Sequence, residues 1–201
     1  MIVLLRHGTT EDNAHKRVRR ADTPLSDEGR QAAQDAADSM KGMPIQEILA
    51  SPLPRAQETA QIWAKTVGVP MRTVPELAAR SMGALEGKPV SQVQSILDTL
   101  AKHPHVAPPG KGESVAQFVN DRYLPAVKPL IDAKELYGVV GHGSGIKAIE
   151  LGLQQAPLSK WNKEPVIQPG QWALISKDGL QVHDQAGMDS KTARPESGAS
   201  S

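Results

Sequence analysis

The sequence predicts an α/β fold with three layers, in which a mostly parallel sheet has helices on both faces. The first observation is the apolar run Ile2–Leu5, which is typical of a buried strand in a parallel sheet. The second is a similar run over Tyr137–Gly141. The third is a series of amphipathic stretches between these two runs, with apolar residues at helical spacing. Strands that alternate with helices predict a sheet of this kind.

Both of these strands end in a histidine followed by a glycine. Ile2–Leu5 runs into Arg6-His7-Gly8, and Tyr137–Gly141 runs into His142-Gly143. Open α/β sheets build their ligand sites at the carboxyl ends of the strands. Two parallel strands that bring two histidines to one edge are hard to explain by core packing. We therefore expect the functional site at this edge.

The residues at the end of the first strand suit phosphate chemistry. Arg6 carries a fixed charge on a planar fork of donors that matches phosphate oxygens. His7 is a nucleophile when it is neutral and held in one tautomer. Gly8 allows a sharp turn or a close approach of the backbone to a ligand. Taken alone, these residues fit equally well a strand end with a solvated arginine and a hydrogen-bonded histidine.

The remaining elements follow from spacing and from turn residues. Ser26 is a good N-cap for a helix, with Asp27 and Glu28 at the positive end of its dipole. Pro54 suits the first turn of a second helix, and Gly68 is a good stop for it. The other predicted elements are strands over Ile45–Ala50, Val69–Val74 and Gln171–Ser176, a hairpin partner over Leu180–His183, and helices after Pro89, after Ser114 and through Ile146–Leu153.

Composition narrows the class of protein. The chain of 201 residues predicts one domain over 1–185, followed by a polar tail over 186–201 that we expect to be disordered. A net charge of +1 gives no argument for a nucleic-acid or membrane partner. No run has the length of a membrane span and no leader is present, so a cytoplasmic location is expected. The sequence leaves a homodimer open, and the absence of cysteine excludes disulfides.

An ordered set of motifs resembles the histidine phosphatase superfamily, the phosphoglycerate-mutase-like group. The first triplet alone is a weak signal, but the whole set follows the order of the family and spans residues 2–176. The segments that carry the resemblance are Arg6–Asn13, Pro24–Gly29, Ser51–Ala60, Gly112–Ser114 and Val139–Gly143. The resemblance implies a phosphoglycerate-mutase-like fold.

The resemblance also implies a phosphate clamp. His7 would be the nucleophile, and Arg6, Arg55 and His142 would surround the phosphoryl group. Further contacts with substrate are implied at Gly8, Thr10, Asn13, Arg17, Arg19, Arg20, Gly143 and Ser144. For the three loop arginines, an ordinary solvated face is the alternative interpretation. No metal and no cofactor are expected, because fixed cations neutralise the phosphoryl charge.

One position departs from the pattern of the family. Alignment through Leu77 and Gly83 places Ala79 where the family has a glutamate that donates a proton to the leaving group. Either Glu76 or Glu86 substitutes for it, or the substrate has a good leaving group, or the chain binds phosphate with little or no turnover. General acid catalysis contributes about 10²–10⁴-fold in rate, so the presence or absence of a proton donor has a large effect on the expected activity.

These observations predict a metal-independent phosphatase that forms a phosphohistidine on a small phosphorylated metabolite or nucleotide. A phosphate- or nucleotide-binding module, acting as a sensor or sponge, is the alternative from another class. A protein phosphatase for phosphohistidine or phosphotyrosine is a third interpretation. A phosphoglycerate mutase is less favoured, because that branch has Glu-Ser and Trp where this chain has Thr9-Thr10 and Asp12.

Overall fold

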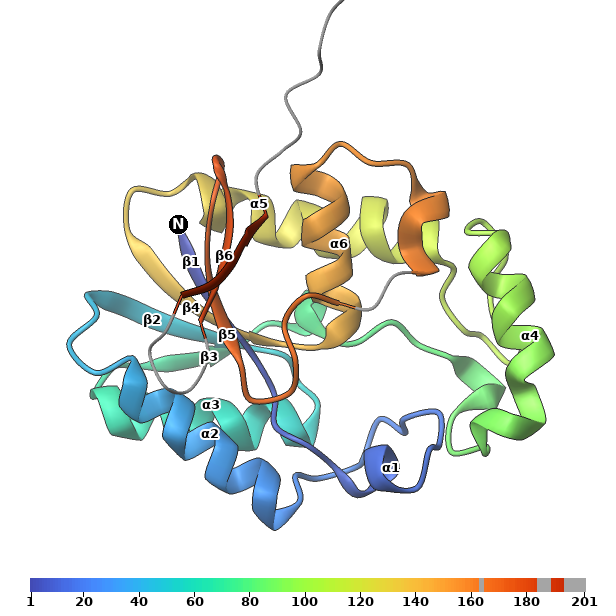
Figure 1. Cartoon of the computed structure of the whole chain (residues 1–201), viewed down its shortest axis with the longest axis horizontal. Helices are drawn as coiled ribbons and strands as arrows, with labels where there is room; N and C mark the ends of the chain where they lie inside the picture. The colour runs from blue at the N-terminus through green and yellow to red at the C-terminus, as the bar shows by residue number, and fades with distance from the viewer. Residues whose placement is uncertain (163–164, 184–188, 194–201) are drawn as a thin grey trace, which may run out of the picture.

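The computed structural model describes residues 1–162, 165–183 and 189–193, which form a seven-stranded sheet with flanking helices (Figure 1). The order of the strands is β3-β2-β4-β1-β5-β6-β7. The four strands from β3 to β1 are parallel, and the other three continue the sheet with antiparallel pairing. The strands are β1 (Ile2–Arg6), β2 (Ile45–Ala50), β3 (Met71–Thr73), β4 (Leu136–Gly141), β5 (Trp172–Ser176), β6 (Gly179–His183) and β7 (Asp189–Ala193).

The helices begin and end at the residues that favour such boundaries. Ser26 caps α2 by accepting a hydrogen bond from the backbone N–H of Gly29. Gly68 ends α3 in the left-handed conformation that glycine adopts without strain. The helices are α1 (Glu11–Ala14), α2 (Asp27–Ser39), α3 (Pro54–Val67), α4 (Val90–Lys102), α5 (Leu124–Asp132) and α6 (Gly143–Leu153), with a π-helical stretch at Gln117–Tyr123 and short 3-10 turns at Pro75–Leu77, Gly83–Leu85 and Leu158–Asn162. No helix in the described ranges is long and apolar enough to cross a membrane.

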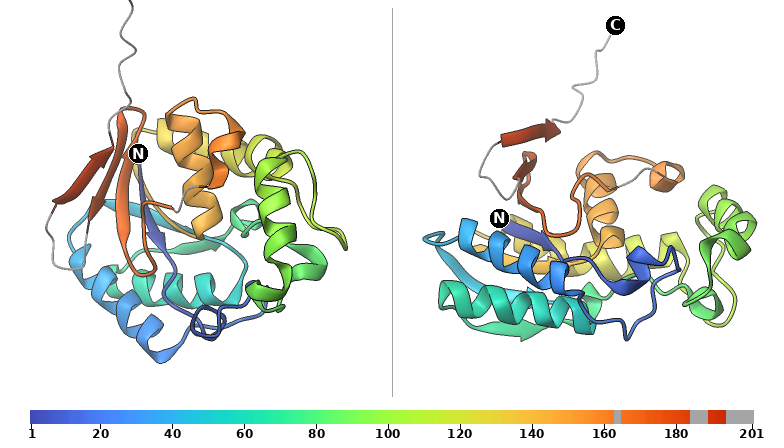
Figure 2. Two further views of the ribbon diagram at one scale, coloured as in Figure 1. Left: turned by 45° about the vertical axis from the view of Figure 1, so that its right-hand side comes forward. Right: turned by 60° about the horizontal axis from the view of Figure 1, so that its bottom comes forward.

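Strand β1 belongs to two hydrophobic cores, because successive side chains of a strand point to opposite faces of the sheet. Ile2 and Leu4 pack in a core with residues of α5 and α6, whereas Val3 and Leu5 pack in a core with residues of α2 and α3. All four side chains are fully buried. The two cores give the three layers that the sequence predicts, with helices on both faces of the sheet (Figure 2).

Helix α4 stands apart from the sheet and has a small apolar cluster of its own. Val93 and Leu100 pack there against Val18, from the loop after β1, and against Leu85. In Figure 1 the helix lies at the side of the molecule, across from α6 and α1. A cavity lies between this helix and the body of the domain.

The α/β prediction is confirmed, and two details differ from it. The sheet is mixed, because the hairpin β5–β6 pairs antiparallel to β1 and extends the sheet on that side. Within the tail over 186–201, where we expected disorder, Asp189–Ala193 forms β7 on the edge of β6. An exposed sheet edge offers unpaired backbone groups to any extended segment, so this pairing needs no apolar pattern. The rest of that tail lies outside the described residues.

Candidate active site

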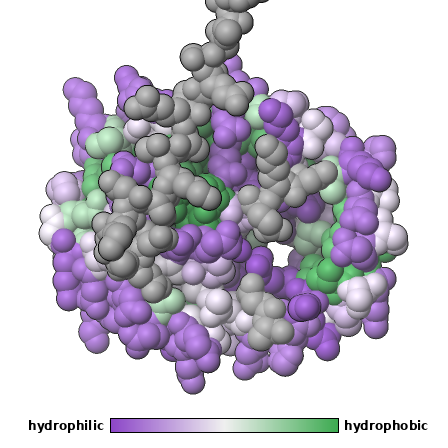
Figure 3. Space-filling model, viewed as in Figure 1, coloured by the Kyte–Doolittle hydropathy of each residue, from purple (hydrophilic) through white to green (hydrophobic). Residues whose placement is uncertain are grey.

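A cavity of about 560 Å³ lies at the carboxyl ends of β1 and β4, where the sequence predicts the site. Its walls include His7 after β1 and His142 after β4, together with Arg55 from the start of α3. Val90 and Leu97 of α4 close it from the other side. In Figure 3 the molecule is hollowed between α4 and the body, with hydrophilic residues on the side of the body and a hydrophobic patch on the side of α4.

The imidazole of His7 is buried and held in one orientation. Its Nδ1 lies 2.6 Å from the carbonyl oxygen of Gly8, and a carbonyl only accepts, so Nδ1 carries the hydrogen. Its Nε2 therefore has a lone pair, and no hydrogen-bond partner among the described residues. Burial lowers the pKa of His7 well below 6.5, and the charges of Arg55, Arg19 and Arg6 lower it further. His7 is thus neutral at neutral pH.

The second histidine lies directly against the first. The ring centroids of His7 and His142 are 4.9 Å apart, with the rings at 60°. The Nε2 of His142 is 2.7 Å from the hydroxyl oxygen of Ser51, which follows β2. Burial, the neighbouring His7 and three arginines lower the pKa of His142 well below 6.5 as well. His142 also occupies the N-cap position of α6, where backbone N–H groups attract an anion.

Two buried arginines flank the histidines, as the resemblance implies. Arg6 is anchored by a 2.8 Å hydrogen bond from Nη1 to the carbonyl oxygen of Ile167. Arg55 donates from Nη1 to the carbonyl oxygens of Arg20 and Ala21, at 2.9 and 3.3 Å. Burial lowers the pKa of Arg55 to about 10, with a further contribution from the charge of Arg19. Both side chains stay charged at neutral pH, in surroundings where an anionic ligand would offset the cost of burying them.

The loop arginines line the cavity, and each occupies a different position. Arg20 pairs with the buried carboxylate of Asp12, which accepts from both its backbone and its side chain. Burial raises the pKa of Asp12, but hydrogen bonds from Thr23 and Arg20 outweigh burial and lower the pKa overall. Arg17 donates to the carbonyl oxygen of Gly87 at 2.8 Å.

All three loop arginines, Arg17, Arg19 and Arg20, are part of the cavity wall. Arg17 and Arg20 are at the same time exposed to solvent, and Arg19 is half-buried. The structure is therefore compatible with both the substrate-contact and the solvated-face interpretation of these arginines.

Three of the predicted substrate contacts lie elsewhere or are not described. Gly8 packs against Gly29 so tightly that an added Cβ would lie 2.3 Å from the carbonyl oxygen of Gly29. Its carbonyl orients His7, and it is not among the described residues that line the cavity. Thr10 is buried and forms an isolated bridge to Leu25, also away from the wall. Asn13 belongs to α1, and its side chain lies outside the described part of the structure.

The start of α6 supplies the other predicted contacts. Gly143 and Ser144 both line the cavity. The hydroxyl of Ser144 accepts a 3.2 Å hydrogen bond from the backbone N–H of Arg80. This bond ties the first turn of α6 to the segment Ala78–Ser81, which crosses the same wall.

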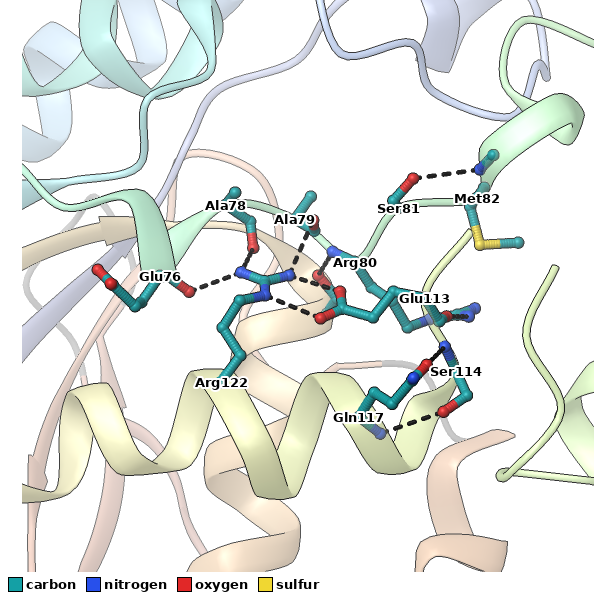
Figure 4. A network of polar contacts seen from close by, with 12 residues as sticks. Glu76, Ala78, Ala79, Arg80, Ser81, Met82, Glu113, Ser114, Gln117 and Arg122 are labelled. Atoms are coloured by element: carbon teal, nitrogen blue, oxygen red, sulfur yellow. Dashed lines mark hydrogen bonds and ion pairs between the residues drawn. The ribbon is translucent and has the colours of Figure 1, made fainter. Parts of the chain in front are cut away.

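The two candidate acids are placed very differently. Ala79 faces the cavity, and so does Glu86, whose Oε1 accepts hydrogen bonds from the Ser81 hydroxyl and the Met82 backbone N–H. Glu76 is exposed, does not line the cavity, and points its carboxylate away from the neighbouring polar groups (Figure 4). Its 3-10 turn directs the side chain outward, so the expectation that Glu76 is near the site because of its place in the sequence is wrong.

The segment that carries Ala79 is held in place from behind by one arginine. Arg122 donates to the carbonyl oxygens of Glu76, Ala78 and Ala79, at 2.7, 3.0 and 3.4 Å. Two further bonds, of 2.8 and 2.6 Å, join the guanidinium to both oxygens of Glu113 (Figure 4). A bidentate pair of this kind is geometrically specific, so it orders the cavity wall.

Arg80, Lys147, Trp161 and Pro165 are among the wall residues that sequence reasoning missed. Lys147 lies one helical turn after Gly143, and that spacing is a signal that could have placed it near the site. The other three reach the cavity through the tertiary fold. No group of three or more histidine, aspartate or glutamate side chains suited to a metal ion occurs among the described residues.

Comparison with known proteins finds the same family that the sequence motifs resemble. The model of the histidine phosphatase superfamily (branch 1) matches residues 2–182. The chain is 37% identical to a probable phosphoglycerate mutase GpmB of Yersinia pestis over 93 residues, which are 46% of this chain and 43% of that protein. The match therefore spans less than half the length of this curated relative.

Solved structures resemble the chain over most of its length. A mycobacterial glucosyl-3-phosphoglycerate phosphatase, solved with VO3, matches with a TM-score of 0.75 and 27% identity over 86% of this chain and 88% of that one. Bacillus stearothermophilus YhfR matches with a TM-score of 0.77 and 26% identity over 99% and 97% of the two chains.

Proposed function

Because the chain belongs to the histidine phosphatase superfamily, we propose that it is a metal-independent phosphatase that acts through a phosphohistidine on His7. The substrate is a small phosphorylated metabolite or nucleotide. Its leaving group is good enough to depart without a strong acid from the protein, as in acyl phosphates, phosphoanhydrides and aryl phosphates.

The observation that carries this proposal is the tautomer of His7. Because Nδ1 donates to the carbonyl of Gly8, the lone pair lies on Nε2, at the wall of the cavity. The lowered pKa keeps that lone pair available at neutral pH. A histidine held in this way among Arg6, Arg55 and His142 is arranged as a nucleophile for an anionic centre.

In the first step, Nε2 of His7 attacks phosphorus and the bond from phosphorus to the leaving oxygen breaks. In the second step, water attacks the same phosphorus and the N–P bond breaks, which returns neutral His7 and releases inorganic phosphate. The proton that the leaving oxygen gains is balanced by one that water loses. The arginines and the start of α6 stabilise the charge on the phosphoryl oxygens in both transition states.

The preference for a good leaving group rests on Ala79. Alanine has no proton to give, and Oε1 of Glu86 already accepts two hydrogen bonds. Glu86 still faces the cavity, and it is the residue to test if alkyl phosphates turn over. A cavity of about 560 Å³ has the size of a small-molecule site.

The test is phosphate release without added metal, from aryl and acyl phosphates through nucleoside polyphosphates to alkyl phosphates. We expect turnover of the activated substrates, and no turnover in His7→Ala. Acid-labile phosphate should appear on His7 when an aryl phosphate reaction is quenched in alkali. Turnover that persists in His7→Ala would overturn the proposal.

The binding-module interpretation predicts a different result. In that case no substrate releases phosphate and no phosphohistidine forms, but a nucleotide or sugar phosphate still binds. Ala79→Glu is then the informative variant, because turnover in this variant would show that the alanine at this one position is the reason for the lack of activity.

A further inference from the structure

The wall of the cavity at His7 and His142 is strongly positive, although one of its arginines, Arg20, is paired with Asp12. Among its described lining residues, Glu86 is the only carboxylate, and seven residues carry a positive charge. These seven are Arg6, Arg17, Arg19, Arg20, Arg55, Arg80 and Lys147. Arg80 and Lys147 are the two that come from elements outside the phosphate clamp and the loop after β1.

Arg80 is a partly buried cation in a fixed position. Its Nη1 donates to the carbonyl oxygen of Glu113 at 2.8 Å, and its backbone N–H donates to Ser144. The carboxylate of Glu113 is engaged at both oxygens by Arg122. A guanidinium has five N–H donors, so Arg80 retains donors for a ligand after bonding the Glu113 carbonyl.

Trp161 places the two cations together. The guanidinium carbon of Arg80 lies 5.9 Å from the ring centroid, and Nζ of Lys147 lies 4.9 Å from it. Cations at such distances are attracted to the ring, which holds them beside each other. Because the protein's own cations already contact the ring, we do not expect a nucleobase to stack on it. The two cations instead favour an anionic group of the ligand next to them.

The same three residues line two cavities. A second cavity of about 620 Å³, along α4, is also lined by Arg80, Lys147 and Trp161. The first cavity, of about 560 Å³, has both His7 and these residues in its wall, so it has room for ligand atoms beyond the phosphoryl group. Leu97 of α4 belongs to both walls and supplies apolar contact between the two polar ends.

We propose that Arg80 and Lys147, held on Trp161, bind a second acidic group of the substrate, so that the preferred substrates are phosphate esters or anhydrides whose leaving group carries a carboxylate or a second phosphate. This inference rests on the proposed function for the position of the first phosphate. It adds the class of leaving group, which the phosphate clamp alone does not specify.

The kinetic test compares phenyl phosphate with para-carboxyphenyl phosphate and para-phenylene bisphosphate. The first two release phenols of similar acidity, so a difference in kcat/KM reports recognition of the extra group. We expect an advantage of about 10- to 100-fold for the substrates with a second acidic group, the range of a charge-assisted hydrogen bond. Whichever of the two gains more identifies carboxylate or phosphate as the preferred group.

The kcat/KM advantage of the substrates with a second acidic group should shrink by about 10-fold or more in Arg80→Gln and also in Lys147→Gln. The second variant keeps the test valid if the first does not fold. The matched control is Arg72→Gln. Arg72 is an exposed arginine of β3 that pairs with Glu47 of β2, and this variant should keep the full advantage. Equal kcat/KM for the three substrates, or an advantage that survives in both cavity variants, would overturn the inference.

An equilibrium measurement separates this inference from the proposed function. Benzylphosphonate and para-carboxybenzylphosphonate resist hydrolysis, and their affinities for the unmodified protein can be compared by calorimetry. Tighter binding of the carboxylate, without turnover of any phosphate, would support the subsite and reject the phosphatase. Turnover with equal affinities would retain the phosphatase and reject the subsite.

Discussion

Mild acid should destabilise this protein steeply, because two imidazoles are buried in neutral form beside several arginines. The pKa values of His7 and His142 lie well below 6.5 in the folded protein. In the unfolded chain both imidazoles contact water and bind a proton below about pH 6.5. The unfolded state therefore binds more protons than the folded state in this range, and the free energy of unfolding falls as the pH falls.

The magnitude follows from linkage. Each histidine that is neutral when folded and protonated when unfolded lowers the free energy of unfolding by about 1.4 kcal/mol per pH unit. His7 and His142 together contribute about 2.7 kcal/mol per pH unit between about pH 6 and the lower pKa values of the folded state. The total stability of a domain is about 5–15 kcal/mol, so a drop to about pH 5 removes a large part of it.

The assay is urea unfolding at a series of pH values between about 7 and 5, in the parent and in His7→Asn and His142→Asn. In each of these two variants, the slope of the free energy of unfolding against pH should be smaller than in the parent by about 1.4 kcal/mol per pH unit, whatever the stability of the variant at neutral pH. His103→Asn, at an exposed position after α4, is the control and should keep the parental slope. Equal slopes in all four proteins would refute the reasoning that the two imidazoles stay neutral when folded.

Two further substitutions test how the site is supported. Arg122→Ala leaves the carboxylate of Glu113, which is 19% exposed, without its bidentate partner, so it should lower the free energy of unfolding in urea by about 2–3 kcal/mol. The control Arg72→Ala removes an exposed ion pair and should cost less than about 1 kcal/mol. Equal losses in the two variants would contradict the role of Arg122 in holding the cavity wall. Gly145→Ala places a Cβ 2.2 Å from the ring of Tyr123, so it should cost about 1–3 kcal/mol and lower the thermal midpoint; an unchanged midpoint would mean that Tyr123 moves aside without strain.

The paired histidines were within reach of sequence reasoning because strand register is regular. β1 and β4 are parallel neighbours, and Arg6 lies opposite Gly141. The next residue of each strand, His7 or His142, therefore leaves the sheet at the same level, which gives the 4.9 Å contact between the rings. Two apolar runs with the same ending were enough to predict this arrangement.

The rest of the wall depends on contacts that no local pattern encodes. Arg80 faces the cavity because Arg122 and Ser144 hold its segment, and these partners are far away in the sequence. Trp161 reaches the site from a short 3-10 turn after α6. Glu76 is the reverse case, a residue that was expected at the site and lies outside it. Its closeness to Ala79 in the sequence does not determine the direction of its side chain.

The central place of β1 has a consequence for how the protein folds. Leu4 pairs with Val139 on one side and with Ala173 on the other, so the strand before His7 has no neighbours until nearly the whole domain has been made. Pairings between such distant parts of a chain form slowly, because loop closure must precede any gain from contact. Among the described strands, β1 precedes all its partners in the chain and is thus among the last to be enclosed, and His7 cannot lie against His142 before β4 has been made.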